Sequence, residues 1–130
     1  MDTSAAIKLI QREQESEQLI AEIQRQEPVL ISRRLLETEL RRAVHRSSSL
    51  EQRDVTELLE RIDLYEVTPV HFTQAGLLPG ANLQSLDAFH VAAAFSLQVD
   101  AIITYDIRMA EVGRDAGLQA LAPGSNALPL

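Results

Sequence analysis

Apolar residues follow two different patterns along this chain, one typical of helices and one typical of strands. Apolar residues three and four apart, a spacing typical of amphipathic helices, predict helices near residues 4–10, 15–26, 34–46, 50–62, 70–78 and 107–116. Short apolar runs between these stretches predict strands at 29–31, 64–68 and 118–121. Strands that alternate with helices indicate a parallel sheet covered by helices on both faces. The pattern therefore predicts an α/β fold.

The most apolar segment runs from Ser85 to Asp106. Its first half predicts a helix that is apolar on every side, which we expect to be buried, with Ser85 as its N-cap. Asp87 lies in the first turn of this helix, and Asp106 follows a short β-branched run. Reactive groups of open α/β sheets lie beyond the carboxyl ends of the strands, so Asp106 is a candidate site residue. The simpler alternative is that both carboxylates serve a helix end.

Length and composition indicate how many domains the protein has and where in the cell it is expected. A chain of 130 residues predicts one domain over 1–130, with a frayed tail at about 123–130. The sequence has no cysteine, no visible signal peptide and no apolar run long enough to span a bilayer. We therefore expect a soluble, cytoplasmic protein without membrane contact.

The charge balance is acidic, with 19 Asp and Glu against 12 Lys and Arg and a net charge of −7. This balance argues against broad capture of nucleic acid, because non-specific affinity comes mainly from Lys and Arg. It does not exclude a protein that binds nucleic acid through a metal ion held by carboxylates. One basic segment, from Arg33 to Arg46, predicts a stripe that faces RNA or a partner; its alternative is a solvated helix side with i,i+4 ion pairs.

Four acids occupy strand-to-helix junctions or inward helix faces: Asp2, Glu39, Asp87 and Asp106. Glu39 lies among the apolar positions of its helix, whereas Glu37 points to another side. The sequence contains no glycine-rich phosphate loop, no G-x-S-x-G turn and no His-x-x-x-His zinc pattern. His90, on the apolar helix, is expected to be a hydrogen-bonded core residue. Thr3 or Ser4 is expected to cap the first helix.

Four motifs carry a resemblance to a known family. They are Asp-Thr-Ser-Ala at 2–5, Glu-Leu-Arg-Arg-Ala at 39–43, Ser-Leu-Asp-Ala-Phe-His-Val-Ala-Ala-Ala at 85–94 and Ile-Thr-Tyr-Asp at 103–106. In this order, over nearly the whole chain, they resemble the PIN-domain family, specifically VapC-type toxins of bacterial and archaeal toxin–antitoxin pairs. The two later motifs together are the more specific part of the match.

The resemblance implies a fold, an activity and a site. The fold is a three-layer α/β/α sandwich with a short, mostly parallel central sheet. The activity is that of an endoribonuclease that needs Mg²⁺ or Mn²⁺ and hydrolyses RNA with a metal-activated water. The implied catalytic and metal-binding residues are Asp2, Glu39, Asp87 and Asp106, supported by hydroxyls of Thr3, Ser4 or Thr104. The implied partners are an RNA substrate, a VapB-type antitoxin and a second copy in a homodimer.

One departure from the family concerns the first acid, which usually follows a short apolar strand, whereas here only Met1 precedes Asp2. We expect either that the true chain starts upstream or that the sheet lacks most of a central strand. Two other functions compete. A non-catalytic binding or regulatory module would use the same acids as caps and structural ion pairs. Phosphoryl transfer through an aspartyl intermediate would use Asp2, but its usual Asp-x-Asp motif is broken by Ser4.

Overall fold

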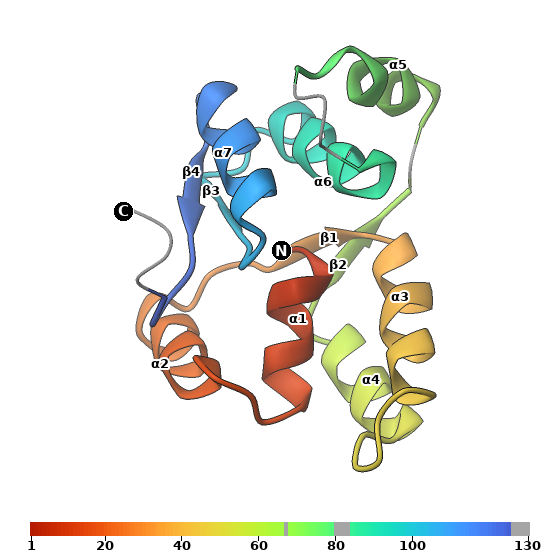
Figure 1. Cartoon of the computed structure of the whole chain (residues 1–130), viewed down its shortest axis with the longest axis vertical. Helices are drawn as coiled ribbons and strands as arrows, with labels where there is room; N and C mark the ends of the chain where they lie inside the picture. Colours follow the sequence, from red (N-terminus) through yellow and green to blue (C-terminus); the bar gives the residue numbers. More distant parts are fainter. Residues whose placement is uncertain (67, 80–83, 126–130) are drawn as a thin grey trace.

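A computed structural model describes residues 1–66, 68–79 and 84–125, apart from the side chains of residues 86 and 87. Helices and short strands alternate in this part of the chain, as the hydrophobic pattern predicts (Figure 1). The elements are α1 (Thr3–Ile10), α2 (Ser16–Gln26), β1 (Ile31–Arg33), α3 (Leu35–Val44), α4 (Gln52–Leu59), β2 (Asp63–Tyr65), α5 (Pro69–Leu77), α6 (Ser85–Ser96), β3 (Ala101–Ile103), α7 (Ile107–Asp115) and β4 (Gln119–Leu121).

The strands form two parallel pairs rather than one sheet within the described residues. β1 pairs with β2, with Ser32 opposite Leu64, and β3 pairs with β4, with Ile102 opposite Ala120. The α/β class and the parallel pairing are confirmed, whereas the three-layer sandwich around one sheet stays a prediction. The first two residues lie between the pairs: the Met1 amine donates to the Ile31 carbonyl at 3.0 Å, and the Asp2 amide donates to the Ile103 carbonyl at 3.2 Å.

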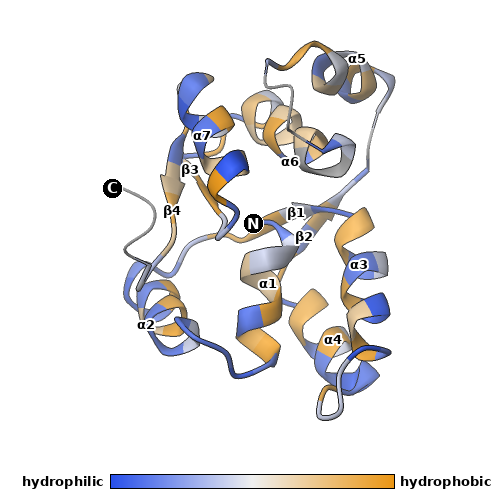
Figure 2. Cartoon of the chain, viewed as in Figure 1, coloured by the Kyte–Doolittle hydropathy of each residue, from blue (hydrophilic) through white to orange (hydrophobic). Residues whose placement is uncertain are grey.

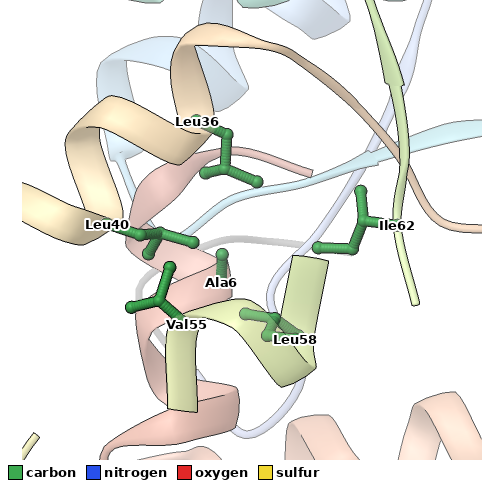
Figure 3. Close-up of a cluster of buried hydrophobic side chains, with 6 residues drawn as sticks. All are labelled: Ala6, Leu36, Leu40, Val55, Leu58 and Ile62. Atoms are coloured by element: carbon green, nitrogen blue, oxygen red, sulfur yellow. The ribbon is translucent and has the colours of Figure 1, made fainter. Parts of the chain in front are cut away.

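One hydrophobic core joins three helices next to the first strand pair. Its buried members come from α1, α3, α4 and the residue before β2; they are Ala6, Leu36, Leu40, Val55, Leu58 and Ile62 (Figure 3). Leu36 and Leu40 lie four residues apart, on the same face of α3, and both are fully buried. Ala6 is small, which allows α1 to approach the leucines of α3 closely. This core fixes the helix that carries Glu39 against the helix that follows Asp2.

A second core joins α6, α7 and the β3–β4 pair. Its buried members are Ala94, Ile102, Ala110, Ala120 and Ala122. The residues of α6 are mostly apolar around the helix (Figure 2), and Val91 and Ala92 are buried. The prediction of burial on every side is nevertheless wrong for Phe95, which is 58% exposed. The helix packs against α5 on another side, where Phe72 meets Phe89 edge to face at 5.0 Å.

Several boundaries differ from those the pattern predicts. β1 begins at Ile31, two residues later than predicted, and continues through the polar Ser32 into Arg33. The residue before α6 that acts as N-cap is Gln84, so the prediction of Ser85 as the cap is wrong. Gly117 follows α7 with φ of 90°, a left-handed conformation that favours glycine and ends the helix as predicted. None of the helices in the described ranges is both long and apolar enough to cross a membrane.

Candidate active site

Asp2 is the N-cap of α1. Its backbone is extended, and its Oδ1 accepts hydrogen bonds from the Ala5 amide at 3.1 Å and the Ser4 hydroxyl at 2.8 Å. The prediction that Thr3 or Ser4 caps this helix is therefore wrong, because both residues lie inside it. Asp2 is 5% exposed. The carboxylate is thus held at a helix N-terminus, where backbone N–H groups and the helix dipole stabilise negative charge.

Thr104 links Asp2 to the turn between β3 and α7. Its hydroxyl is fully buried, donates to Asp2 Oδ2 at 2.7 Å and accepts the Asp106 amide at 3.0 Å. The Ser4 hydroxyl accepts the Tyr105 amide at 2.9 Å and lies 3.4 Å from the Thr104 hydroxyl. Residues more than one hundred positions apart are therefore joined by one network of hydroxyl groups. Two of the three hydroxyls predicted to support the site, Ser4 and Thr104, lie in it.

Burial controls the charge on Asp2. Removal of the carboxyl from water raises its pKa above the ordinary value of 3.8, and hydrogen bonds from Thr104, Ser4 and Ala5 oppose this rise. Burial also lowers the pKa of the Met1 ammonium, which the negative charge of Asp2 opposes. A carboxylate in this state gains most from a nearby cation, because a positive charge favours its ionised form and offsets the lost hydration.

Asp106 is half-buried and caps α7. Its Oδ1 accepts the amides of Arg108 at 2.9 Å and Met109 at 3.3 Å. This is the helix-cap role that the sequence offers as the simpler alternative. The position at the carboxyl end of β3 is also the one predicted for a site residue. The Thr104 hydroxyl, which accepts the Asp106 amide, brings this turn next to Asp2.

Glu39 lies on α3 and faces Arg33, a buried residue at the end of β1. Its Oε1 accepts from Arg33 Nη2 at 3.0 Å and lies 3.9 Å from Nε2 of His90. Arg33 is 1% exposed, so the prediction that it belongs to an outward basic stripe is wrong. Arg34 is exposed and pairs with Glu66, and the partly exposed Arg41 makes the i,i+4 pair with Glu37 that the solvated alternative predicts.

His90 is buried on α6, but it is not the hydrogen-bonded residue that the sequence predicts. Its Nε2 makes no hydrogen bond within the described part of the chain. Burial and then the positive charge of Arg33 hold the pKa of His90 well below 6.5, so the ring is neutral at pH 7. A neutral imidazole and a buried guanidinium therefore flank the same oxygen of Glu39.

Asp87 and Thr3 are the two remaining residues that the sequence predicts for the site. Asp87 lies in the first turn of α6, three residues before His90, and its side chain is outside the described part. The Thr3 hydroxyl is buried and makes no hydrogen bond within the described residues. Among those same residues, no three side chains of Asp, Glu, His or Cys are grouped closely enough to hold a metal ion.

Comparisons with known proteins place this arrangement in a family. The PIN domain matches residues 1–115, which is most of the chain. The chain belongs to the PIN-domain family. Among its relatives, Ribonuclease VapC35 of Mycobacterium tuberculosis (strain CDC 1551 / Oshkosh) is 36% identical over 95% of this chain and 96% of its own length. Ribonuclease VapC46 of M. tuberculosis (strain ATCC 25618 / H37Rv) is 33% identical over 95% of each chain, and Ribonuclease VapC47 (strain CDC 1551 / Oshkosh) is 33% identical over 96% of each chain. The resemblance to VapC-type toxins that the four motifs carry is thereby confirmed.

Two residues of this PIN domain, Arg33 and His90, have contacts that differ from those the sequence predicts. Arg33 follows a short apolar run and precedes another arginine, so it reads as surface charge; only its distance to Glu39 reveals a buried ion pair. His90 gives a weak signal, because a lone histidine on an apolar helix is compatible with a packed core. The one usable clue is that His90 and Asp87 share the same motif, three residues apart.

Proposed function

We propose that this PIN domain is a metal-dependent endoribonuclease toxin that hydrolyses RNA phosphodiesters. The relatives at 33–36% identity are named ribonucleases and align with almost the whole chain. The observation that carries the proposal is the Asp2–Thr104–Asp106 network, which brings a buried carboxylate to the turn that bears a second acid. Such a network holds the oxygens of Asp2 in place before a cation binds.

The proposed metal ligands are Asp2, Glu39, Asp87 and Asp106. Carboxylate oxygens suit Mg²⁺ and Mn²⁺, and the buried, desolvated Asp2 has the chemistry expected of such a ligand. When bound, the cation offsets charge on the phosphate and lowers the pKa of a water molecule. The protein's own contribution is positional. Thr104 and Ser4 hold both oxygens of Asp2, and Arg33 holds Glu39.

The partners in this proposal are an RNA substrate, a VapB-type antitoxin that inhibits the toxin, and a second copy in a homodimer, all in the cytoplasm. Exposed aromatic and aliphatic side chains on α5 and α6 support a docking surface of this kind. Phe72 is 60% exposed, Leu77 is 79% exposed and Phe95 is 58% exposed. The two helices that carry these residues contact each other, and exposed apolar patches are typical of protein interfaces.

Cleavage of purified total RNA by antitoxin-free protein tests the proposal. We expect discrete fragments in Mg²⁺ or Mn²⁺ that disappear with EDTA and with Asp106→Asn. Asp115→Asn, at the far end of the same helix, is the matched control and should cleave normally. Glu39→Gln should lose cleavage, whereas Glu37→Gln should retain it. Wild-type cleavage by Asp106→Asn would show that the site assignment is wrong.

A non-catalytic binding module is the second candidate. The observation in its favour is that Asp2 and Asp106 both cap helices, a role that needs no metal. Thermal unfolding during a Mg²⁺ titration separates the two functions, because a ligand that binds only the folded state raises the unfolding temperature. A nuclease site should give a rise that depends on Asp2 and Asp106. No rise, together with no cleavage, would favour the binding module.

A further inference from the structure

His90 is a buried polar residue to which the proposed function gives no role. It lies in the middle of α6 and is 8% exposed, and its Nε2 has no hydrogen-bond partner among the described residues. Buried polar atoms without a partner are rare, because a group removed from water loses its hydrogen bonds to the solvent. An unpartnered ring nitrogen at this depth therefore points to a role at a functional site.

A carboxylate oxygen lies close to this nitrogen. Glu39 Oε1 is 3.9 Å from His90 Nε2 and accepts a hydrogen bond from Arg33 Nη2 at 3.0 Å. The His90 contact exceeds a normal N–H···O distance by about 1 Å. Rotation of the Glu39 side chain can supply this shift, because that side chain is 25% exposed and has several rotatable bonds. One oxygen of Glu39 can thus accept from both neighbours.

The helix that carries His90 also carries one of the proposed metal ligands. Asp87 lies three residues before His90 in α6, and α6 packs against β1, the strand that ends with Arg33. Carboxylates that bind metal usually accept hydrogen bonds from neighbouring side chains. Hydrogen bonds of this kind are often long in an empty site and shorten when the site is filled. A bond from His90 to Glu39 would connect the acid on α3 to the helix that bears Asp87.

We propose that His90 is a positioning residue for Glu39, whose Oε1 accepts a hydrogen bond from the Nε2–H of the ring when the carboxylate serves as a metal ligand. The proposal rests on the proposed metal-dependent function and adds to it a residue that is not an acid. Arg33 and His90 then hold the same oxygen from two elements, β1 and α6. The other oxygen of Glu39, Oε2, is left for the cation.

The position of the ring proton is the first test. Nε2 donates a hydrogen bond only when it carries the proton, so we expect the Nε2–H form of the neutral ring. Long-range ¹H–¹⁵N NMR spectra of the protein in EDTA identify the protonated nitrogen of each of the three histidines, and His90→Gln identifies the signals of His90 by their loss. A neutral ring protonated at Nδ1 would overturn the proposal, because its Nε2 could only accept.

Calorimetric titration with Mn²⁺ measures what the ring contributes to metal binding. His90→Gln keeps an N–H donor near the position of Nε2 and should bind Mn²⁺ within about threefold of the wild-type affinity, whereas His90→Leu lacks a donor and should bind at least about tenfold more weakly. His71→Leu is the matched control: it replaces a second buried histidine, which lies on α5 and accepts the Thr68 amide, and should bind like the wild type. Circular dichroism confirms that each variant is folded.

The outcomes of the titration distinguish the role of His90 from the proposed function. Wild-type affinity in His90→Leu would refute the role of His90 and leave the metal site standing. Equal weakening in His90→Gln and His90→Leu would also refute it, because the ring would then act through its packing rather than through its N–H. Absence of Mn²⁺ binding by the wild type would contradict both this proposal and the proposed function.

Discussion

Replacement of Thr104 by valine tests the hydroxyl network on which the proposed site depends. Valine keeps the shape of threonine but removes the hydroxyl that donates to Asp2 and accepts the Asp106 amide. A hydrogen bond to a charged group contributes about 1.5–3 kcal/mol, and a buried amide left without a partner costs about 1–3 kcal/mol. Thr104 and Asp2 are both buried, so water cannot replace the bond between them. We expect a loss of about 3 kcal/mol in the free energy of unfolding.

Urea-induced unfolding followed by circular dichroism in EDTA measures this loss. The midpoint should fall while the dependence of the free energy on urea stays unchanged, because the surface exposed on unfolding is the same. Thr104→Ser is the matched control: it keeps the hydroxyl, loses a methyl group and should cost only about 1 kcal/mol. A valine variant as stable as the serine variant would refute the role assigned to the hydroxyl.

Three further predictions concern the acid on α1, the ion pair on α3 and the first core. Burial raises the pKa of Asp2 in the folded state above its value of 3.8 in the unfolded state. Between these two pKa values the folded state binds more protons than the unfolded state does. The free energy of unfolding should therefore fall as the pH rises through this range. Asp2→Asn should remove this slope in urea midpoints measured in EDTA from about pH 4 to about pH 8; equal slopes for both proteins would contradict the assignment. Arg33→Met leaves Glu39 without its buried partner and should cost about 3 kcal/mol by urea unfolding, whereas Arg34→Met on the surface should cost less than about 1 kcal/mol. Leu40→Ala should cost about 2–5 kcal/mol, in contrast to Leu77→Ala, which is 79% exposed and should cost less than about 0.5 kcal/mol; similar losses would argue against the core in Figure 3.

The helices could be predicted because amphipathic spacing is a local property. Leu36 and Leu40 show their shared face in the sequence, and the structure buries both. The turn at Asp106 could be predicted for a similar reason, since a β-branched run and a helical pattern meet there. Asp106 lies at this strand-to-helix turn, a position that by itself does not distinguish a helix cap from a metal ligand.

The features that escaped prediction depend on contacts between distant residues. Arg33 is polar in the sequence, yet it extends β1 because its guanidinium meets Glu39 inside the fold. The cap of α1 is Asp2 rather than its neighbours because Thr104, about one hundred residues away, holds the Asp2 carboxylate in place. Phe95 looks like a core residue from its helix, but the way α6 packs leaves it on the surface. Local patterns carry no information on such partners.

The first two residues connect the stability of the fold to the geometry of the site. The Met1 amine bonds to β1, the Asp2 amide bonds to β3, and the Ser32 hydroxyl donates to the Met1 carbonyl at 2.8 Å. The Asp2 side chain meanwhile binds Ser4 and Thr104. Because Met1 and Asp2 together join the two strand pairs and Asp2 supplies the buried carboxylate, any movement between the sheets displaces that carboxylate. The position of the acid is therefore a property of the whole sheet junction, and α1 alone does not determine it.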